Sequence, residues 1–210
     1  MKMDEVSRIN KQVRKPKQSR SINTKEKILE VAFTLFCKKG YYNTTTNEIA
    51  KQADVSIGSL YSYFKDKDSI LLEILELYNQ EFITAKEEVL AQAQIFEVDK
   101  KAWFRLMIDA FIKAHEASKE LIRELNVLYY VNPQVAAILD KQREESRLAI
   151  LDYISLHKDD VQVEDIEAAT TLAFDFATVI VDRVVFGQNN IAKERIIKNG
   201  IEAIYKFLFD

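Results

Sequence analysis

Residues 45–64 have the sequence TTNEIAKQADVSIGSLYSYF, which contains the boundary signals of two short helices. Thr45 and Glu48 have the spacing of a capping box, in which a hydroxyl and a carboxylate satisfy reciprocal backbone amides at a helix start. Asp54 and Ser56 then interrupt the helical pattern after about two turns, and the Ser56 hydroxyl can cap a second short helix. Two short helices joined by a three-residue turn are typical of a helix-turn-helix.

The segments on both sides of this motif also have helical periodicity. An apolar face begins after Thr24, and Gly40 ends this first helix. Asp66 can cap a longer helix, whose apolar stripe continues to about Gln94. Residues 23–68 are therefore predicted to form a three-helix domain, followed by a long connecting helix.

The remaining residues, 69–210, show helical periodicity with few turn signals and no strand pattern. The chain has 210 residues, of which only 4 are Gly and 2 are Pro, so a turn-rich β fold is disfavoured. The sequence predicts an all-α fold, with an N-terminal three-helix helix-turn-helix domain and a larger helical domain. Further helices are expected at residues 100–117, 119–131, 134–157, 163–186 and 190–209.

Charge divides the chain into two parts of opposite sign. Residues 1–68 contain 14 Lys and Arg against 8 Asp and Glu, whereas residues 69–210 contain 16 against 25. A basic part on an otherwise acidic chain suits a polyanion partner, because bound cations are released from phosphates. Residues 1–22 have no apolar periodicity and are predicted to be a disordered basic arm. The arm can follow DNA, or it can serve as a solvated tail.

Several classes of function are disfavoured by the composition. Cys37 is the single cysteine, which excludes an internal disulfide and any zinc site with two Cys ligands. His115 and His157 have no partners at metal-ligand spacing, so neither an enzyme, a metal site nor a cofactor is expected. The sequence has no run of 18 apolar residues and no apolar signal segment near its start, so we expect a cytoplasmic protein without a membrane partner.

The second helix of the motif carries no carboxylate on its polar face. Leu60 and Phe64 must point inward to hold the helix on its neighbours. The residues expected to point outward are Ile57, Gly58, Ser59, Ser62 and Tyr63, with Tyr61 near the edge. Hydroxyl groups can donate to phosphates or base edges, and an apolar side chain can pack on a thymine methyl group. Exposed Ser and Tyr also occur on ordinary surface helices, so this face alone does not identify a DNA reader.

Three motifs follow one another between Lys25 and Glu76. They are Ile28-Leu29-x-x-Ala32-x-x-Leu35-Phe36-x-x-x-Gly40-Tyr41, Thr45-Thr46-x-x-Ile49-Ala50 and Gly58-x-Leu60-Tyr61-x-Tyr63-Phe64-x-x-Lys67. Together they resemble the DNA-binding domain of the TetR family of bacterial transcriptional regulators. The resemblance implies that DNA is touched by Thr46, Ser56, Gly58, Ser59, Tyr61, Ser62, Tyr63 and Lys67, to which we add Ile57 as an apolar base contact.

Two residues depart from the family pattern. Ile57 stands where the family often has a basic or small residue, so a phosphate contact is exchanged for apolar base contact. Asp54 stands where a turn glycine is usual; Asp tolerates the left-handed conformation, although its charge is unfavourable near DNA.

The resemblance also implies that the part after about residue 70 is an all-helical ligand-binding body, whose last two helices pair with a second subunit. The stretch from Ala168 to Val181 contains one charged residue, Asp175, which fits either a central core helix or a helix shared with a partner. Aromatic and soft apolar residues suit a pocket for a hydrophobic ligand, although most are expected to be core. The candidate ligand-binding residues are Trp103, Phe104, Met107, Phe111, Tyr129, Tyr130 and Phe174.

Together with the resemblance, the sequence thus predicts a ligand-responsive transcriptional regulator, and the common mode of the TetR family implies a repressor. It is expected to bind a pseudo-palindromic DNA operator as a homodimer and to be released by a small hydrophobic effector. The alternative is a helical dimer that binds a ligand or partner and has a non-functional DNA-binding head.

Overall fold

The computed structural model describes residues 17–188 and 190–210, and helices account for most of them. The helices are α1 (Lys17–Lys39), α2 (Thr46–Gln52), α3 (Ile57–Tyr63), α4 (Lys67–Leu90), α5 (Ala93–Val98), α6 (Lys100–Ala117), α7 (Lys119–Tyr129), α8 (Pro133–Leu156), α9 (Ile166–Phe186) and α10 (Lys193–Phe209), with a short 3₁₀ helix at Lys158–Asp160. The described residues contain no strand, so the all-α prediction is confirmed. None of their helices is both long and apolar enough to cross a membrane.

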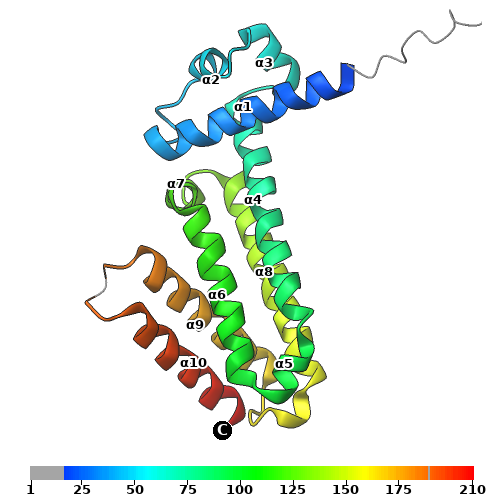
Figure 1. Ribbon diagram of the computed structural model, residues 1–210, viewed down its shortest axis with the longest axis vertical. Helices are drawn as coiled ribbons and strands as arrows, with labels where there is room; N and C mark the ends of the chain where they lie inside the picture. Colours follow the sequence, from blue (N-terminus) through cyan, green and yellow to red (C-terminus); the bar gives the residue numbers. More distant parts are fainter. Residues whose placement is uncertain (1–16, 189) are drawn as a thin grey trace, which may run out of the picture. The chain divides into compact units, whose positions relative to one another are not determined.

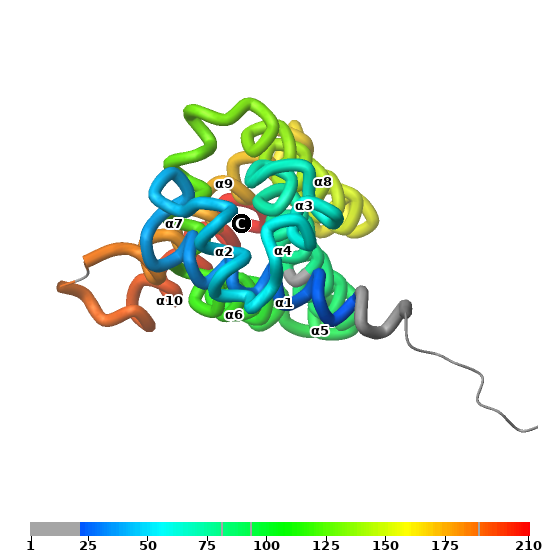
Figure 2. Tube along the Cα trace, turned by 90° about the horizontal axis from the view of Figure 1, so that it is seen from above, coloured from blue at the N-terminus to red at the C-terminus, as the bar shows by residue number. Residues whose placement is uncertain are grey.

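The chain divides between Leu71 and Leu72 into two compact units. We call the first unit the head and the second the body. In the head, α1, α2 and α3 pack side by side (Figures 1 and 2). Their shared core contains the fully buried side chains of Ile28, Ile49 and Leu60, which come from one helix each. Burial of such aliphatic side chains is the main stabilising contribution to this small unit.

Helix α1 begins earlier than the sequence pattern indicates. The basic arm was predicted to extend to residue 22, and this boundary is wrong for residues 17–22, which belong to α1. Lys17, Gln18 and Arg20 are good helix formers. The helix can therefore begin several residues before its apolar face does. The arm prediction for residues 1–16 falls outside the described residues.

The body is built around α9, which packs against α6, α8 and α10 (Figure 1). Its core includes a cluster of aromatic rings around the fully buried Trp103. The Trp103 ring stacks on Tyr153 with centroids 5.0 Å apart and meets Phe96 edge-on at 5.2 Å. Offset stacking and edge contacts are the favourable geometries for aromatic pairs.

Most body helices were predicted, and the clear miss is α5. The fourth helix was expected to continue to about Gln94, but it ends at Leu90, and α5 follows after a two-residue break. No Gly or Pro marks this break in the sequence. The break brings Phe96 into the aromatic cluster, where it is fully buried, so tertiary packing overrides the local helical pattern.

Helices α9 and α10 approach each other closely at Gly200. A Cβ atom at this position would contact Cδ1 of Ile180 and lie 2.9 Å from its Cγ1. A larger residue would therefore force a shift in the packing, and the glycine lets the two helices come together.

Candidate nucleic-acid interface and ligand cavity

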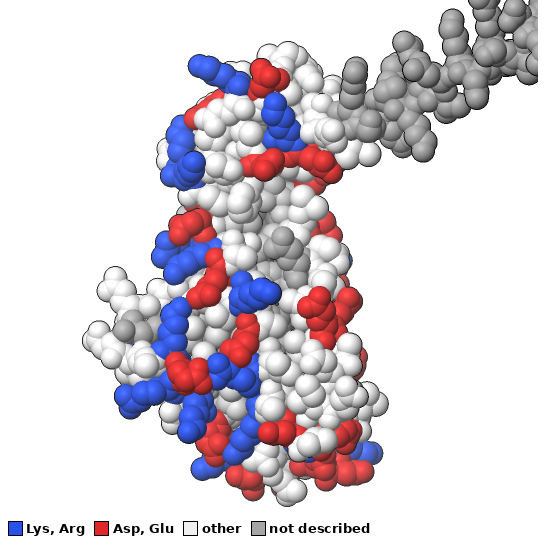
Figure 3. Space-filling model, in the orientation of Figure 1, with Lys and Arg blue, Asp and Glu red and all other residues white. Residues whose placement is uncertain are grey.

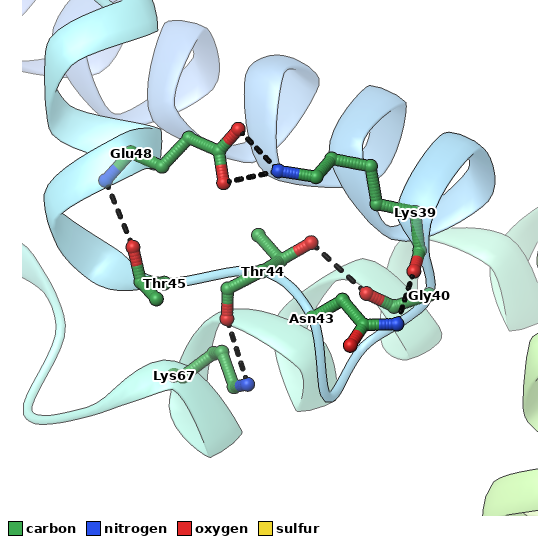
Figure 4. A network of polar contacts seen from close by, with 7 residues as sticks. All are labelled: Lys39, Gly40, Asn43, Thr44, Thr45, Glu48 and Lys67. Carbon is green, nitrogen blue, oxygen red and sulfur yellow. Dashed lines mark hydrogen bonds and ion pairs between the residues drawn. The ribbon is translucent and has the colours of Figure 1, made fainter.

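The start of α2 contains half of the predicted capping box. The Thr45 hydroxyl accepts a hydrogen bond from the Glu48 amide at 3.2 Å, as expected. The Glu48 carboxylate does not complete the box; it accepts two hydrogen bonds, at 2.7 and 2.9 Å, from Nζ of Lys39 (Figure 4). The reciprocal contact was therefore predicted wrongly, because the end of α1 offers a cationic donor. The ion pair joins α1 to α2 and neutralises one basic residue of the head.

The turn between α2 and α3 has the expected chemistry. Asp54 has φ 54°, which is the left-handed conformation that Asp tolerates, so this expectation is confirmed. Ser56 is the N-cap of α3, and its hydroxyl accepts from the Ser59 amide at 3.0 Å, which confirms the predicted cap. These two residues set the direction in which α3 leaves the turn.

Helix α3 buries one face and exposes the other. Leu60 and Phe64 are buried, as predicted. Of the residues expected outside, Ile57, Gly58 and Ser62 are exposed, whereas Ser59 and Tyr63 are half-buried. The expectation that Tyr61 lies near the edge is wrong: 51% of its surface is exposed, more than that of Tyr63. The exposed face contains hydroxyls, one aliphatic side chain and one glycine, and no carboxylate.

Two candidate contact residues on different helices meet at the surface. The hydroxyl oxygens of Thr46 on α2 and Tyr61 on α3 lie 3.1 Å apart, so one donates to the other. This pair positions two hydroxyls next to each other, and each retains capacity for a further hydrogen bond.

Lys67 has a role that the sequence did not indicate. We expected its ammonium group to be a point charge for a phosphate. In the structure, Nζ donates to the carbonyls of Tyr41 at 2.7 Å and Thr44 at 2.8 Å, and it lies 4.1 Å from the centroid of the Tyr41 ring (Figure 4). Burial lowers the pKa of Lys67. The residue thus holds the loop between α1 and α2, and a direct phosphate contact stays a prediction.

Tyr41 is fixed from its other end as well. Its hydroxyl donates a hydrogen bond to the Asp68 carboxylate. Burial, together with this hydrogen bond, raises the pKa of Tyr41 well above its usual value. The first turn of α4 therefore holds the α1–α2 loop through both Lys67 and Asp68.

The seven candidate ligand residues in the body line two cavities. The smaller cavity, of about 40 Å³, is bordered by Trp103, Phe104 and Met107. The larger one, of about 470 Å³, is bordered by Tyr129 and Tyr130. Phe111 and Phe174 border both cavities and form a shared wall.

The larger cavity also has polar lining residues that the sequence did not single out. They include Asn126 on α7, Asp140 and Arg143 on α8, and Asp182 on α9; His115 on α6, which the sequence analysis considered only as a metal ligand, lines the cavity too. Their signal was weak, because isolated polar residues on long amphipathic helices usually face solvent. Only the packing of four helices brings them to one place.

His115 is held as a neutral side chain. Its Nδ1 lies 2.8 Å from the carbonyl oxygen of Phe111, which can only accept, so Nδ1 carries the proton. Burial lowers the pKa of His115, and Nε2 is therefore an acceptor at neutral pH. The ring of His115 meets Phe82 edge-on, with centroids 4.8 Å apart.

The described residues contain no group of three His, Cys, Asp or Glu side chains that could hold a metal ion. His157, the second histidine, lies with Nδ1 2.9 Å from the Tyr153 carbonyl and Nε2 2.6 Å from the Glu97 carboxylate. Cys37 is half-buried in α1.

Comparison with known proteins identifies the head. Residues 28–74 match the family model of bacterial regulatory proteins of the tetR family. These residues are a TetR-family domain. The HTH-type transcriptional regulator QacR of Staphylococcus aureus is 52% identical over 56 residues, which are 27% of this chain and 30% of QacR. AcrR of Shigella flexneri is 45% identical over 64 residues, 30% of this chain and 29% of AcrR. The matched segment thus spans less than a third of the length of each of these two relatives.

Beyond the TetR-family domain, the likeness in sequence is weaker, and the solved structures show a likeness of fold. The probable regulator YttP of Bacillus subtilis is 28% identical over 150 residues, which cover 63% of this chain and 72% of YttP. The crystal structure of a putative TetR-family transcriptional regulator from Mesorhizobium loti superposes with a TM-score of 0.70 at 19% identity, covering 91% of this chain and 99% of that one. The fatty acid degradation regulator FadR of Bacillus halodurans gives 0.66 at 17% identity, covering 86% and 94%.

Proposed function

We propose that this protein is a ligand-responsive transcriptional regulator that binds an operator through the exposed face of α3. The observation that carries the proposal is the carboxylate-free surface of α3, which a TetR-family domain presents after a left-handed Asp54 turn and a Ser56 cap. Such a surface can enter a major groove without repelling phosphates. The proposed DNA contacts are Thr46, Ser56, Ile57, Gly58, Ser59, Tyr61, Ser62, Tyr63 and Lys67.

We propose a homodimer because α9 exposes an apolar stripe. Leu172 and Val179 are each 59% exposed and Phe176 is 42% exposed, at the i, i+4 and i+7 positions of one helix face. The opposite face of α9 is buried in the body core, so the helix is apolar on two sides. Exposed apolar helix faces of this kind are typical of subunit interfaces. Phe207 on α10 is a further exposed aromatic residue of the body, 45% exposed.

A two-fold dimer presents two copies of α3. They would read successive major grooves about 34 Å apart, and the operator would be pseudo-palindromic. Repression is the simpler sign of regulation, because a bound dimer blocks access to the DNA. Since its proposed partner is DNA, we propose that the protein acts in the cytoplasm.

We propose that the larger cavity binds the effector and that α4 responds to it. Tyr78 and Phe82 of α4 border this cavity, and the same helix begins at Lys67, which holds the α1–α2 loop. A ligand releases DNA only if it binds the non-DNA-binding state better. Shifting the balance from 1:99 to 99:1 requires about 5.5 kcal/mol of preference.

Gly58 offers a test that separates DNA binding from folding. A Cβ at Gly58 would meet only the Ser56 hydroxyl, at 4.0 Å, so a side chain fits there. Gly58→Glu adds a carboxylate to the first turn of α3, where negative charge stabilises a helix but repels a phosphate backbone. We expect the variant to melt no earlier than wild type and to lose binding to duplexes selected from a randomised pool. Gly58→Gln is the uncharged control and should retain more affinity.

A steep decrease of affinity with salt is expected for the wild type, because phosphate contacts release counterions. Retained affinity in Gly58→Glu would remove the proposed reading surface. If selection recovers no specific duplex, while small molecules still raise the melting temperature, the protein is a ligand-binding dimer with a non-functional head.

A further inference from the structure

We propose that the head chooses its operator by the C5 methyl groups of the bases, which Ile57 contacts in the major groove. This inference rests on the proposed function, in which Ile57 is one of several DNA contacts. It adds which chemical group of the DNA decides the bound sequence, and it predicts that 5-methylcytosine can take the place of thymine.

Helix α3 lacks the side chains that distinguish bases by paired hydrogen bonds. Its seven residues, Ile57–Tyr63, include no Arg, Lys, Asn, Gln, Asp or Glu. Arg and Lys recognise guanine, Asn and Gln recognise adenine, and Asp and Glu accept from cytosine. Helix α2, as the first helix of the motif, is expected to cross the phosphate backbone rather than enter the groove. The face that enters the groove therefore has none of the groups that usually select one base pair over another.

The hydroxyl groups of this surface discriminate poorly between bases. A hydroxyl both donates and accepts, so it can pair with an acceptor on one base or with the amino group of another. The Ser62 hydroxyl donates its one proton to the Ser59 carbonyl at 2.6 Å. The hydroxyls of Thr46 and Tyr61 already share one hydrogen bond, at 3.1 Å. Hydrogen bonding from these groups therefore positions the helix more than it selects a sequence.

Ile57 is the one aliphatic side chain that α3 offers to a groove. It is 38% exposed, whereas Leu60, the other aliphatic residue of the helix, is fully buried. Ile57 is the first residue of α3, and recognition helices contact base edges with their N-terminal residues. At the next position, Gly58, an added Cβ would meet only the Ser56 hydroxyl, at 4.0 Å. The surface beside Ile57 is therefore open to a base.

The group on DNA that fits Ile57 is the C5 methyl of a pyrimidine. This methyl is the apolar group that thymine presents in the major groove. Burial of one methyl group contributes about fourfold in affinity, equivalent to about 0.8 kcal/mol. Cytosine methylated at C5 presents the same group at the same place. Because α3 has no side chain dedicated to O4 of thymine or N4 of cytosine, the methyl group decides between them.

The experiment begins with a duplex that the full-length wild type selects from a randomised pool. Each thymine is then replaced in turn by uracil, symmetrically in both half-sites, which removes the methyl groups and leaves base pairing unchanged. We expect one position at which affinity falls about fourfold per half-site, or about 15-fold in the symmetric duplex. A change below about twofold at every thymine would overturn the proposal without any variant.

Four symmetric duplexes then separate the methyl group from the hydrogen-bonding edge at the sensitive position. They carry thymine, uracil, 5-methylcytosine or cytosine, each opposite its complementary purine. We expect thymine to bind about 15-fold more tightly than uracil, and 5-methylcytosine to exceed cytosine by about the same factor. If 5-methylcytosine binds no better than cytosine, hydrogen bonds decide the base and the proposal is refuted.

Ile57→Ala assigns the effect to the side chain. Because Ile57 is exposed, we expect the variant to keep its melting temperature, and its affinities for the thymine and uracil duplexes should agree within about twofold. Ile191→Ala, the same change at an exposed position of the body, is the matched control and should keep the wild-type ratio. A wild-type ratio in Ile57→Ala would refute the assignment to this residue.

The results separate this inference from the proposed function. If no specific duplex is selected, both fail. If a duplex is selected and its affinity falls steeply with salt, while uracil replaces every thymine without loss, only the methyl contact fails and DNA binding through the head stands.

Discussion

The substitution Lys67→Met keeps the length of the side chain and removes its charge and donors. Two charge-assisted hydrogen bonds to the carbonyls of Tyr41 and Thr44 are lost. Each contributes about 1.5–3 kcal/mol when a charged group is involved, and the half-buried position of Lys67 favours the lower end. We therefore expect the head to lose about 3 kcal/mol of stability.

Hydrogen exchange locates this loss. Opening of the α1–α2 loop should become more than 100-fold more frequent in Lys67→Met, since each 1.4 kcal/mol is a factor of ten. Peptides covering residues 40–45 report on the loop, and peptides from α9 serve as an internal reference. Lys65→Met, at a neighbouring exposed lysine, is the matched control and should change stability by less than about 0.5 kcal/mol.

DNA affinity distinguishes the two roles of Lys67. If the residue holds the loop, affinity falls together with loop protection. Unchanged protection combined with weaker binding and a reduced salt dependence would refute the loop-holding role and favour the direct phosphate contact.

Three further predictions concern the body. Gly200→Ala should destabilise it by about 1–3 kcal/mol in chemical denaturation, because its methyl group collides with Ile180, and adding Ile180→Val should recover part of the loss. Burial lowers the pKa of His115 in the folded state. Its stabilising contribution is therefore present above the unfolded pKa of about 6.5 and is lost as the pH falls through the folded pKa. In His115→Asn, the melting temperature should depend less steeply on pH below about 6.5 than in wild type. Phe176→Glu should shift the protein from dimer to monomer in analytical ultracentrifugation, whereas Val98→Glu, at another exposed apolar position, should leave the dimer intact.

Local signals predicted most of the fold. Helix α6 has the bounds 100–117 that its periodicity predicted, and in the structure Asp99 caps its start, where the side chain accepts from the Ala102 amide at 3.0 Å. Helix α5 was missed because no local breaker separates it from α4; the buried position of Phe96 is a property of the assembled core. Capping chemistry is local, whereas the decision to break a helix for packing is not.

The head site was predictable to a similar degree. The turn at Asp54 and the cap at Ser56 depend on neighbouring residues and were found. The contacts of Lys67 depend on carbonyls 23 and 26 residues earlier in the chain, and no sequence spacing reveals them.

The lining of the two cavities was not predictable from the sequence. Aromatic residues in the body indicated a pocket, but their division between two cavities follows from the packing of α6 and α9. Asp182 lies one residue beyond the low-charge stretch that ends at Val181; it is solvent-exposed, and only the packing of the helices shows that it also borders the larger cavity.

In the body, charged side chains of both signs are spread over the surface seen in Figure 3. Some of them form ion pairs, such as Lys101 Nζ with Glu202 Oε2 at 2.7 Å. Exposed pairs of this kind contribute little to stability, typically below about 1 kcal/mol. The cost of changing charges there is correspondingly small.

The partition made by Phe111 and Phe174 has a consequence for how the binding range can change over evolutionary time. Truncating either ring is expected to widen the connection between the two cavities without changing the helices that carry them. If the larger cavity binds the proposed effector, the range of accepted molecules can then change through single-codon replacements in the body, while the exposed face of α3 stays as it is.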